Sequence, residues 1–112
     1  MDDREMLELA AKAMGIKLSR WNSDNQAYRL DRDDGGWWNP LKDDGDCARL
    51  EAALSIDITW FDNRVEATCY TEQANFKVID AAAHYEDFPD KQSARRHASV
   101  QVAAEIGKQE GK

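Results

Sequence analysis

The sequence has no apolar run that approaches the about 20 residues that a membrane-spanning helix needs. Cysteine is scarce: Cys47 and Cys69 lie in unrelated segments, and no C-x-x-C spacing marks a metal or redox motif. The first residues also lack the basic and then apolar pattern of a signal peptide. These absences predict a cytosolic protein with reduced thiols, no disulfide and no membrane association.

Positive charge is also in short supply, with 15 Lys and Arg against 22 Asp and Glu and a net charge of −7. Nucleic acids and membrane surfaces are both negatively charged, so this balance argues against direct binding to either. Acidity keeps a small protein soluble, and it also suits a basic protein surface, including one that normally binds nucleic acid. The 112 residues predict a single domain over residues 1–112, with residues 108–112 as a polar tail.

Three segments have the apolar spacing of amphipathic helices. The first begins after a cap at Asp2 or Asp3 and stops at Gly15. The second is capped by Asp43 or Asp44, and the third begins at a cap on Asp90 and ends at Gly107, before the polar tail. The predicted buried stripes are Met6, Leu9, Ala10 and Ala13 in the first helix, Cys47, Leu50, Ala53 and Leu54 in the second, and Ala94, Ala98, Val102 and Ile106 in the third.

Alternating apolar and polar residues indicate strands between these helices. The predicted strands are 16–21 and 27–30, joined as a hairpin, then 55–61 and 64–70, then 76–79 extending toward His84. In the strand 55–61, Ile56, Ile58 and Trp60 share one face. Asp62-Asn63 suits a two-residue turn with positive φ at both positions. The chain therefore predicts an α+β fold in the order α-β-β-α-β-β-β-α, with one mainly antiparallel sheet of four to five strands packed against three helices.

The segment from Asp31 to Asp46 differs from its surroundings, since it holds six Asp, three Gly, two adjacent Trp and a Pro. Clustered carboxylates suit Ca²⁺, but the segment fails the EF-hand template: counted from Asp31, a glycine takes position 5 and Lys42 takes position 12. Capping and turn chemistry explain most of these Asp residues, so no metal and no cofactor is predicted. A metal-dependent or acid–base enzyme that uses this segment is the alternative.

Trp37 and Trp38 make this segment an ordered loop, because two indole rings are too apolar to remain in solvent. Adjacent side chains in an extended segment point to opposite sides, so we expect one ring in the core and the other near the surface. An exposed Trp is a frequent anchor of protein interfaces. The other interpretation is that both rings cover the sheet edge or the base of the second helix.

No local motif joins a nucleophile, a base and an orienting group, so no catalytic residue is predicted. The two histidines, His84 and His97, do not stand at metal-ligand spacing. His97 follows Arg95 and Arg96, and the three predict a small solvated basic patch on the last helix.

The stretch from Gly36 to Leu50, GWWNPLKDDGDCARL, is similar to a W-x-P-x-x-D-x-x-D-A-x-x-L pattern in small uncharacterised proteins of tailed phages and prophages. The opening DREMLELAAK and the last helix also resemble theirs, although Cys47 stands where that pattern has Ala. These proteins are described as a phage α-β-α sandwich domain, with no biochemical role that could be carried to particular residues. Small acidic phage proteins often bind host or phage proteins, and inhibitors of bacterial defence systems such as anti-CRISPR proteins fit that description.

The leading hypothesis is a non-enzymatic phage or prophage accessory protein that binds a host or phage protein in the bacterial cytosol. A homodimeric structural protein is a further alternative, so the chain is expected to be a monomer or a homodimer. The residues predicted to bind the partner are Trp37, Trp38, Asp33, Asp34, Asp43 and Asp44.

Overall fold

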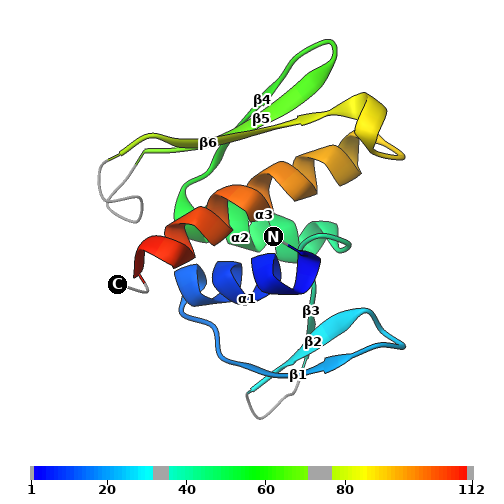
Figure 1. Ribbon diagram of the computed structural model, residues 1–112, viewed down its shortest axis with the longest axis vertical. Helices are drawn as coiled ribbons and strands as arrows, with labels where there is room; N and C mark the ends of the chain where they lie inside the picture. The colour runs from blue at the N-terminus through cyan, green and yellow to red at the C-terminus, as the bar shows by residue number, and fades with distance from the viewer. Residues whose placement is uncertain (1, 32–35, 71–76, 111–112) are drawn as a thin grey trace.

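Three helices form a layer between two antiparallel sheets, with one sheet on each side of the layer (Figure 1). The computed structural model describes residues 2–31, 36–70 and 77–110. In this range the helices are α1 (Asp3–Met14), α2 (Asp44–Leu54) and α3 (Lys91–Glu110), with a short 3₁₀ helix η2 (Tyr85–Asp87) before α3. The first sheet consists of β1 (Leu18–Asn22), β2 (Ala27–Leu30) and β3 (Trp37–Trp38), and the second of β4 (Asp57–Trp60), β5 (Arg64–Cys69) and β6 (Ile79–His84).

The predicted α+β class with antiparallel pairing is confirmed, but the prediction of one sheet with four to five strands is wrong. The strands form two separate three-stranded sheets in the orders β1-β2-β3 and β4-β5-β6. The predicted element order also missed β3, whose two residues pair with Tyr28 and Arg29 of β2. The helix α2 follows β3 and precedes β4, and it carries the chain from one side of the helical layer to the other (Figure 1).

The first helix begins and ends where the sequence predicts. The Asp2 side chain accepts a hydrogen bond from the Glu5 N–H at 2.8 Å and so caps the helix. Gly15 adopts a left-handed φ of 72°, and its N–H bonds back to the Ala11 and Lys12 carbonyls. Leu9 and Ala13 of the predicted stripe are only partly buried. The fully buried face consists of Met6, Leu7, Ala10 and Ala11.

The predicted hairpin of β1 and β2 is confirmed, and so is the cap of α2. The Asp43 carboxylate accepts the Asp46 N–H at 2.7 Å. In the predicted stripe of α2, Cys47, Leu50 and Leu54 are buried, but the prediction that Ala53 is buried is wrong. The contacts of α2 are mainly with α3, so only a narrow stripe of α2 is covered, and Ala53 lies beside it.

The hairpin of β4 and β5 is also confirmed, but its turn differs from the prediction. The Phe61 N–H donates to the Arg64 carbonyl at 2.8 Å, as a two-residue turn requires. Among the described non-glycine residues, positive φ occurs only at Gln26 and Ser55, so the positive φ expected at Asp62 and Asn63 is wrong. The Tyr85 backbone N–H donates to the Asn63 carbonyl at 3.1 Å, so a contact from outside the hairpin also constrains this turn.

The next strand, β6, runs from Ile79 to His84, so the predicted extension toward His84 is confirmed, whereas residues 77 and 78 precede the strand. Phe76, where the predicted strand began, lies outside the described residues. All six residues of β6 pair with β5, from Ile79 opposite Cys69 to His84 opposite Arg64.

The last helix is the centre of the molecule. Asp90 caps it as predicted and accepts the Ser93 N–H at 2.7 Å. The predicted stop at Gly107 is wrong, because α3 continues to Glu110 and takes residues 108–110 from the predicted polar tail. Gly107 is instead a crossing point: a Cβ at this position would overlap the Leu9 carbonyl group of α1.

Residues on several faces of α3 are buried, because α1 and α2 pack on it from one side and β5 and β6 from the other. These buried residues are Ala94, Ala98, Ser99, Val100, Val102, Ala103, Ala104, Ile106 and Gly107. The small side chains of this set allow neighbouring backbones to approach closely. The core of the domain therefore surrounds α3 and does not lie between two sheets.

Candidate functional site

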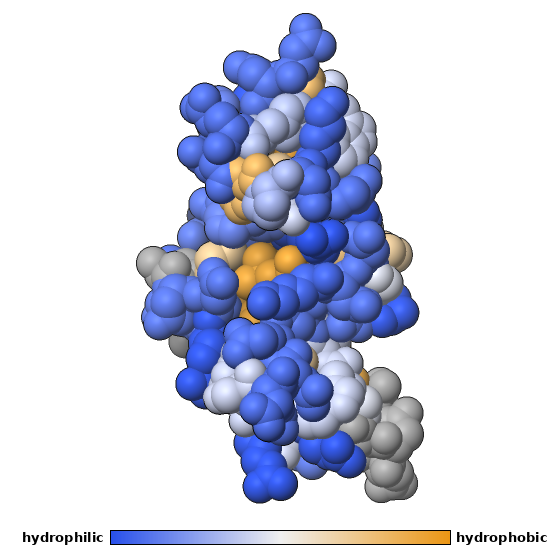
Figure 2. All heavy atoms as spheres, turned by 90° about the vertical axis from the view of Figure 1, so that its right-hand side faces the viewer, coloured by the Kyte–Doolittle hydropathy of each residue, from blue (hydrophilic) through white to orange (hydrophobic). Residues whose placement is uncertain are grey.

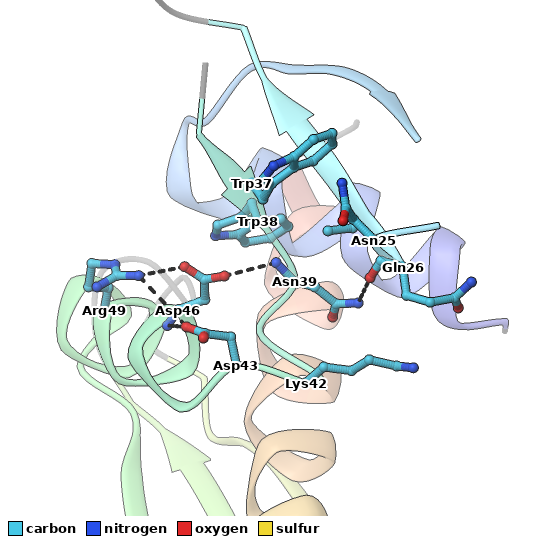
Figure 3. A pocket seen from close by; sticks show the side chains of 10 residues that line it. Asn25, Gln26, Trp37, Trp38, Asn39, Lys42, Asp43, Asp46 and Arg49 are labelled. Atoms are coloured by element: carbon cyan, nitrogen blue, oxygen red, sulfur yellow. Dashed lines mark hydrogen bonds and ion pairs between the residues drawn. The ribbon is translucent and has the colours of Figure 1, made fainter. Parts of the chain in front are cut away.

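A groove of about 530 Å³ opens where β3 meets the start of α2 (Figure 3). The β1–β2 turn and β3 form one wall, and the segment leading into α2 forms the other. The lining residues are Asn25, Gln26, Ala27, Trp37, Trp38, Asn39, Lys42, Asp43, Asp46 and Arg49.

The two tryptophans of β3 lie as the alternation of an extended strand requires. Trp38 is buried in the core with 3% of its surface exposed, whereas Trp37 is 43% exposed. The prediction that one ring enters the core and the other lies near the surface is confirmed. The Arg29 guanidinium lies 5.5 Å from the centre of the Trp37 ring, which is a cation–π distance. Trp37 is therefore the apolar side chain that this groove offers to a ligand.

The buried Asn39 fixes the loop between β3 and α2. Its backbone N–H donates to the Asp46 carboxylate at 2.9 Å, and its side-chain amide donates to the Gln26 carbonyl at 2.5 Å. Its side-chain oxygen accepts the Leu41 N–H at 2.9 Å. Asn39 thus ties together the β1–β2 turn, the loop and α2, and it places Trp37 on a rigid support. In sequence, an Asn before Pro40 in an Asp-rich segment is only a weak signal for this role.

The described acidic residues of the groove mainly serve the structure. Asp46 is buried and accepts hydrogen bonds from Asn39 and from Arg49, the latter at 2.5 Å. Asp43 caps α2, and its side chain remains 61% exposed. Of the other residues predicted to bind a partner, Asp33 and Asp34 lie outside the described residues. The role of Asp46, which the sequence reasoning did not single out, depends on contacts made only in the folded chain.

The predicted solvated basic patch at Arg95, Arg96 and His97 is wrong. Arg96 donates to the Asp44 carboxylate at 2.6 Å and to the Leu41 carbonyl at 2.9 Å, and its side chain is only 13% exposed. Asp44 is therefore paired with α3, even though its own side chain is 62% exposed.

His97 is half-buried and packs against Phe88 with ring centres 5.1 Å apart. Burial is the main influence on this imidazole, and it lowers the His97 pKa below its ordinary value of 6.5. Within the described part of the chain, its buried Nδ1 has no hydrogen-bond partner. The ring thus behaves as an uncharged packing element near neutral pH.

A second polar cluster lies between α2 and α3. Glu51 accepts two hydrogen bonds from Arg95, at 2.6 and 3.0 Å, and one from the Ser99 hydroxyl at 2.5 Å. The Cys47 thiol points at the same carboxylate, with 3.5 Å between Sγ and Oε2. Burial, and next the Glu51 charge, raise the pKa of Cys47 to about 12. A thiol with this pKa stays protonated at neutral pH, so the cluster joins helices and does not supply a nucleophile.

Among residues 2–31, 36–70 and 77–110, no three His, Cys, Asp or Glu side chains lie close enough together to hold a metal ion. No helix in the same ranges is both long enough and apolar enough to cross a membrane.

Figure 2 shows one side of the molecule, where apolar side chains reach the surface beside the second sheet and at the level of the helices, surrounded by hydrophilic ones. The groove is thus lined by one exposed indole ring, that of Trp37, and by several polar side chains.

No protein-family model, no curated protein and no solved structure matches this chain.

Proposed function

We propose that this chain is a non-catalytic accessory protein of phage or prophage type that binds a host or phage protein in the bacterial cytosol. Inhibition of a bacterial defence system is one role of this kind. The exposed Trp37 at the mouth of the groove supports the proposal most strongly. The likeness of the segment around it to phage proteins supports the setting.

Trp37 has the properties of an interface anchor. A side chain of this size loses much apolar surface to water when a partner covers it, and Trp is among the residues that contribute most to binding. Its backbone is held by the pairing of β3 with β2, and the loop after it is held by Asn39 and Asp46. Because the support is already ordered, binding loses little conformational entropy at this site.

The charges around Trp37 indicate what kind of protein surface suits the groove. Asp43 and Arg49 lie 4.0 Å apart with side chains 61% and 69% exposed, and Lys42 also lines the groove. Both signs are therefore available for hydrogen bonds and ion pairs at the rim. The net charge of −7 of the whole chain favours a basic partner at long range, such as a protein that itself binds nucleic acid.

The test compares two tryptophans of similar exposure. Tagged wild type, Trp37→Ala and Trp60→Ala are used to capture proteins from bacterial lysates, with and without phage infection, and bound proteins are quantified by mass spectrometry. Trp60 is 47% exposed and lies on β4 of the other sheet, so it controls for the loss of any surface indole. A partner of the groove is retained by wild type and Trp60→Ala and lost by Trp37→Ala.

Each protein lost in this way is then purified, and its affinity is measured by titration calorimetry. We expect Trp37→Ala to weaken binding at least about 30-fold, because an anchor contributes about 2 kcal/mol or more. Circular dichroism of the variant shows whether the fold is retained. A folded Trp37→Ala variant that captures the same proteins as wild type would refute the proposal.

A further inference from the structure

The strand β4 leaves one edge of its sheet open. The sheet order is β4-β5-β6, so β4 pairs on one side only, and no described strand pairs with its other side. Phe61 and Arg64 form a hydrogen-bonded pair at the turn. Antiparallel pairing alternates, so the N–H and C=O groups of Trp60 and Ile58 point away from β5, toward the open edge.

This open edge also carries uncovered apolar side chains. Ile58 pairs with Ala67 and Trp60 pairs with Val65, so both point to the face of the sheet that packs on α3. The helix contacts mainly β5 and β6, and β4 extends beyond it. As a result Trp60 is 47% exposed and Ile58 only half-buried, although the sequence placed both on one apolar face with the buried Ile56.

The other sheet edges are better protected against pairing. The β1 edge has an irregular register between Leu18 and Trp21, and β3 is only two residues long. The edge strand β6 points its buried side at α3, and the two ends of its solvent face carry Asp80 and His84. By contrast β4 contains no Pro, Lys or Gly, and its one charged residue is Asp57 at the start. An edge strand with exposed apolar side chains and only one charge favours addition of another strand.

We propose that β4 pairs antiparallel with β4 of a second copy of this chain, with the two-fold axis at Thr59. In this register Ile58 of each copy faces Trp60 of the other, so every outward N–H and C=O group of β4 gains a partner. An axis at Ile58 would instead place Trp60 opposite Ile56, whose N–H already donates to the Glu51 carbonyl at 2.9 Å. An axis at Trp60 would place Ile58 opposite the turn.

The side chains fit the same register. On the helix-facing side, the Ile58 and Trp60 side chains of the two copies meet and cover each other, which removes the exposed apolar surface from water. On the outer side, Asp57 of one copy lies opposite Phe61 of the other. The Arg64 guanidinium lies 4.1 Å from the centre of that Phe61 ring and binds Glu66 of its own chain at 2.8 Å, so each end of the interface brings the Asp57 carboxylate toward a cation that is already paired on one side. Each contact at one end of the interface therefore recurs at the other end.

The partner is a second copy and not a peptide of another protein, because the complementary groups all belong to one chain and recur symmetrically about the axis. A four-residue strand buries little area, so we expect a weak dimer that forms between micromolar and millimolar concentrations. This surface includes Trp60 and not Trp37, so Trp60→Ala should weaken the dimer while leaving capture through the groove intact, and either proposal can fail alone.

The test places a charge on the axis without disturbing the monomer. Thr59 is exposed and lies opposite Glu66 of β5, so the lysine in Thr59→Lys gains an ion-pair neighbour within its own sheet. In the dimer the two lysines lie side by side, and we expect self-association at least about tenfold weaker. Ala82→Lys is the matched control, because Ala82 is exposed and lies opposite the same Glu66 from β6.

Sedimentation equilibrium over this concentration range measures the dissociation constant of each variant. The proposal expects a wild-type dimer, an unchanged Ala82→Lys variant, a weakened Thr59→Lys variant, and recovery of dimer when Thr59→Lys is mixed with Thr59→Glu. A wild type that remains monomeric throughout the range would overturn the proposal. The open edge of β4 would then be a site for a strand of another protein. So would a dimer weakened by Ala82→Lys and unaffected by Thr59→Lys, since that dimer uses the β6 edge.

Discussion

Replacement of Gly107 by Ala tests the close crossing of α1 and α3. A Cβ on Gly107 would lie 2.8 Å from the Leu9 carbonyl carbon and 3.2 Å from its Cα, and it would overlap the Leu9 oxygen. These atoms are backbone, so no side chain can rotate to make room. The helices must separate, and this pair shares the most extensive contact between elements in the described structure.

The size of the effect follows from two opposing contributions. Overpacking of a well-packed core costs about 1–3 kcal/mol, and the rigid backbone contact places Gly107→Ala at the upper end. Ala regains about 1 kcal/mol of helix propensity over Gly, so the free energy of unfolding should fall by about 2 kcal/mol. With a urea dependence of about 2 kcal/mol per molar, the unfolding midpoint moves down by about 1 M.

The measurement is urea unfolding followed by circular dichroism, with Gly45→Ala as the control. The nearest atoms to a Cβ on Gly45 would be side-chain ends, the Asp43 oxygen that caps α2 at 3.1 Å and the exposed Arg49 guanidinium at 3.3 Å, and both can shift by a few tenths of an ångström. That variant should be as stable as wild type or up to about 1 kcal/mol more stable. If Gly107→Ala matches Gly45→Ala, the close approach of α1 and α3 is refuted.

Two further predictions concern the polar cluster between α2 and α3. Glu51→Ala should lower the free energy of unfolding by about 3 kcal/mol, because Arg95 and Ser99 lose their buried partner. Glu66→Ala removes the more exposed salt bridge with Arg64 and should lower it by less than about 1 kcal/mol. Chemical denaturation of both variants measures the two losses, and equal losses would contradict the prediction. The Cys47 thiol should resist a disulfide reagent at neutral pH in the folded state. Rapid labelling of the native protein would contradict this resistance. The Cys47 pKa of about 12 lies above the ordinary 9.0, so the stabilisation of the fold by the neutral thiol is present below pH 9 and is lost as the pH rises toward 12.

The local signals of the sequence predicted the helices and hairpins well. Helix α1 begins after Asp2 and ends before Gly15 because caps act within a few residues, and such contacts are visible in sequence. The exposure of one tryptophan and burial of the other follow from the geometry of a strand, which is equally local.

The partition into two sheets could not be predicted in this way. Alternation shows which residues of a strand share a face, but it does not show which strands become neighbours. The two-residue strand β3 is too short to give a periodic signal. Gly107 illustrates the same limit, because a glycine near the end of a helical pattern is typical of a cap and only the position of Leu9 reveals a crossing.

The candidate site was predictable in part. Trp37 could be found because a large apolar residue in an acidic loop is unusual. The contacts of Asn39 with Asp46 and Gln26 join segments whose distance in space only the fold decides. Arg95 pairs with Glu51, and all three strands of the second sheet lie between them in the sequence. A local sequence pattern cannot show this partner, so it predicts a solvated arginine.

The central position of α3 has a consequence for how the chain acquires its structure during synthesis. The apolar face of α1 emerges from the ribosome about 80 residues before the helix that covers it, and β5 and β6 also await α3. Pairings over such long separations in sequence slow folding, and until they form the apolar surfaces remain open to water and to other chains. The hairpins can form early, but we expect cooperative folding to begin only after α3 has left the ribosomal tunnel.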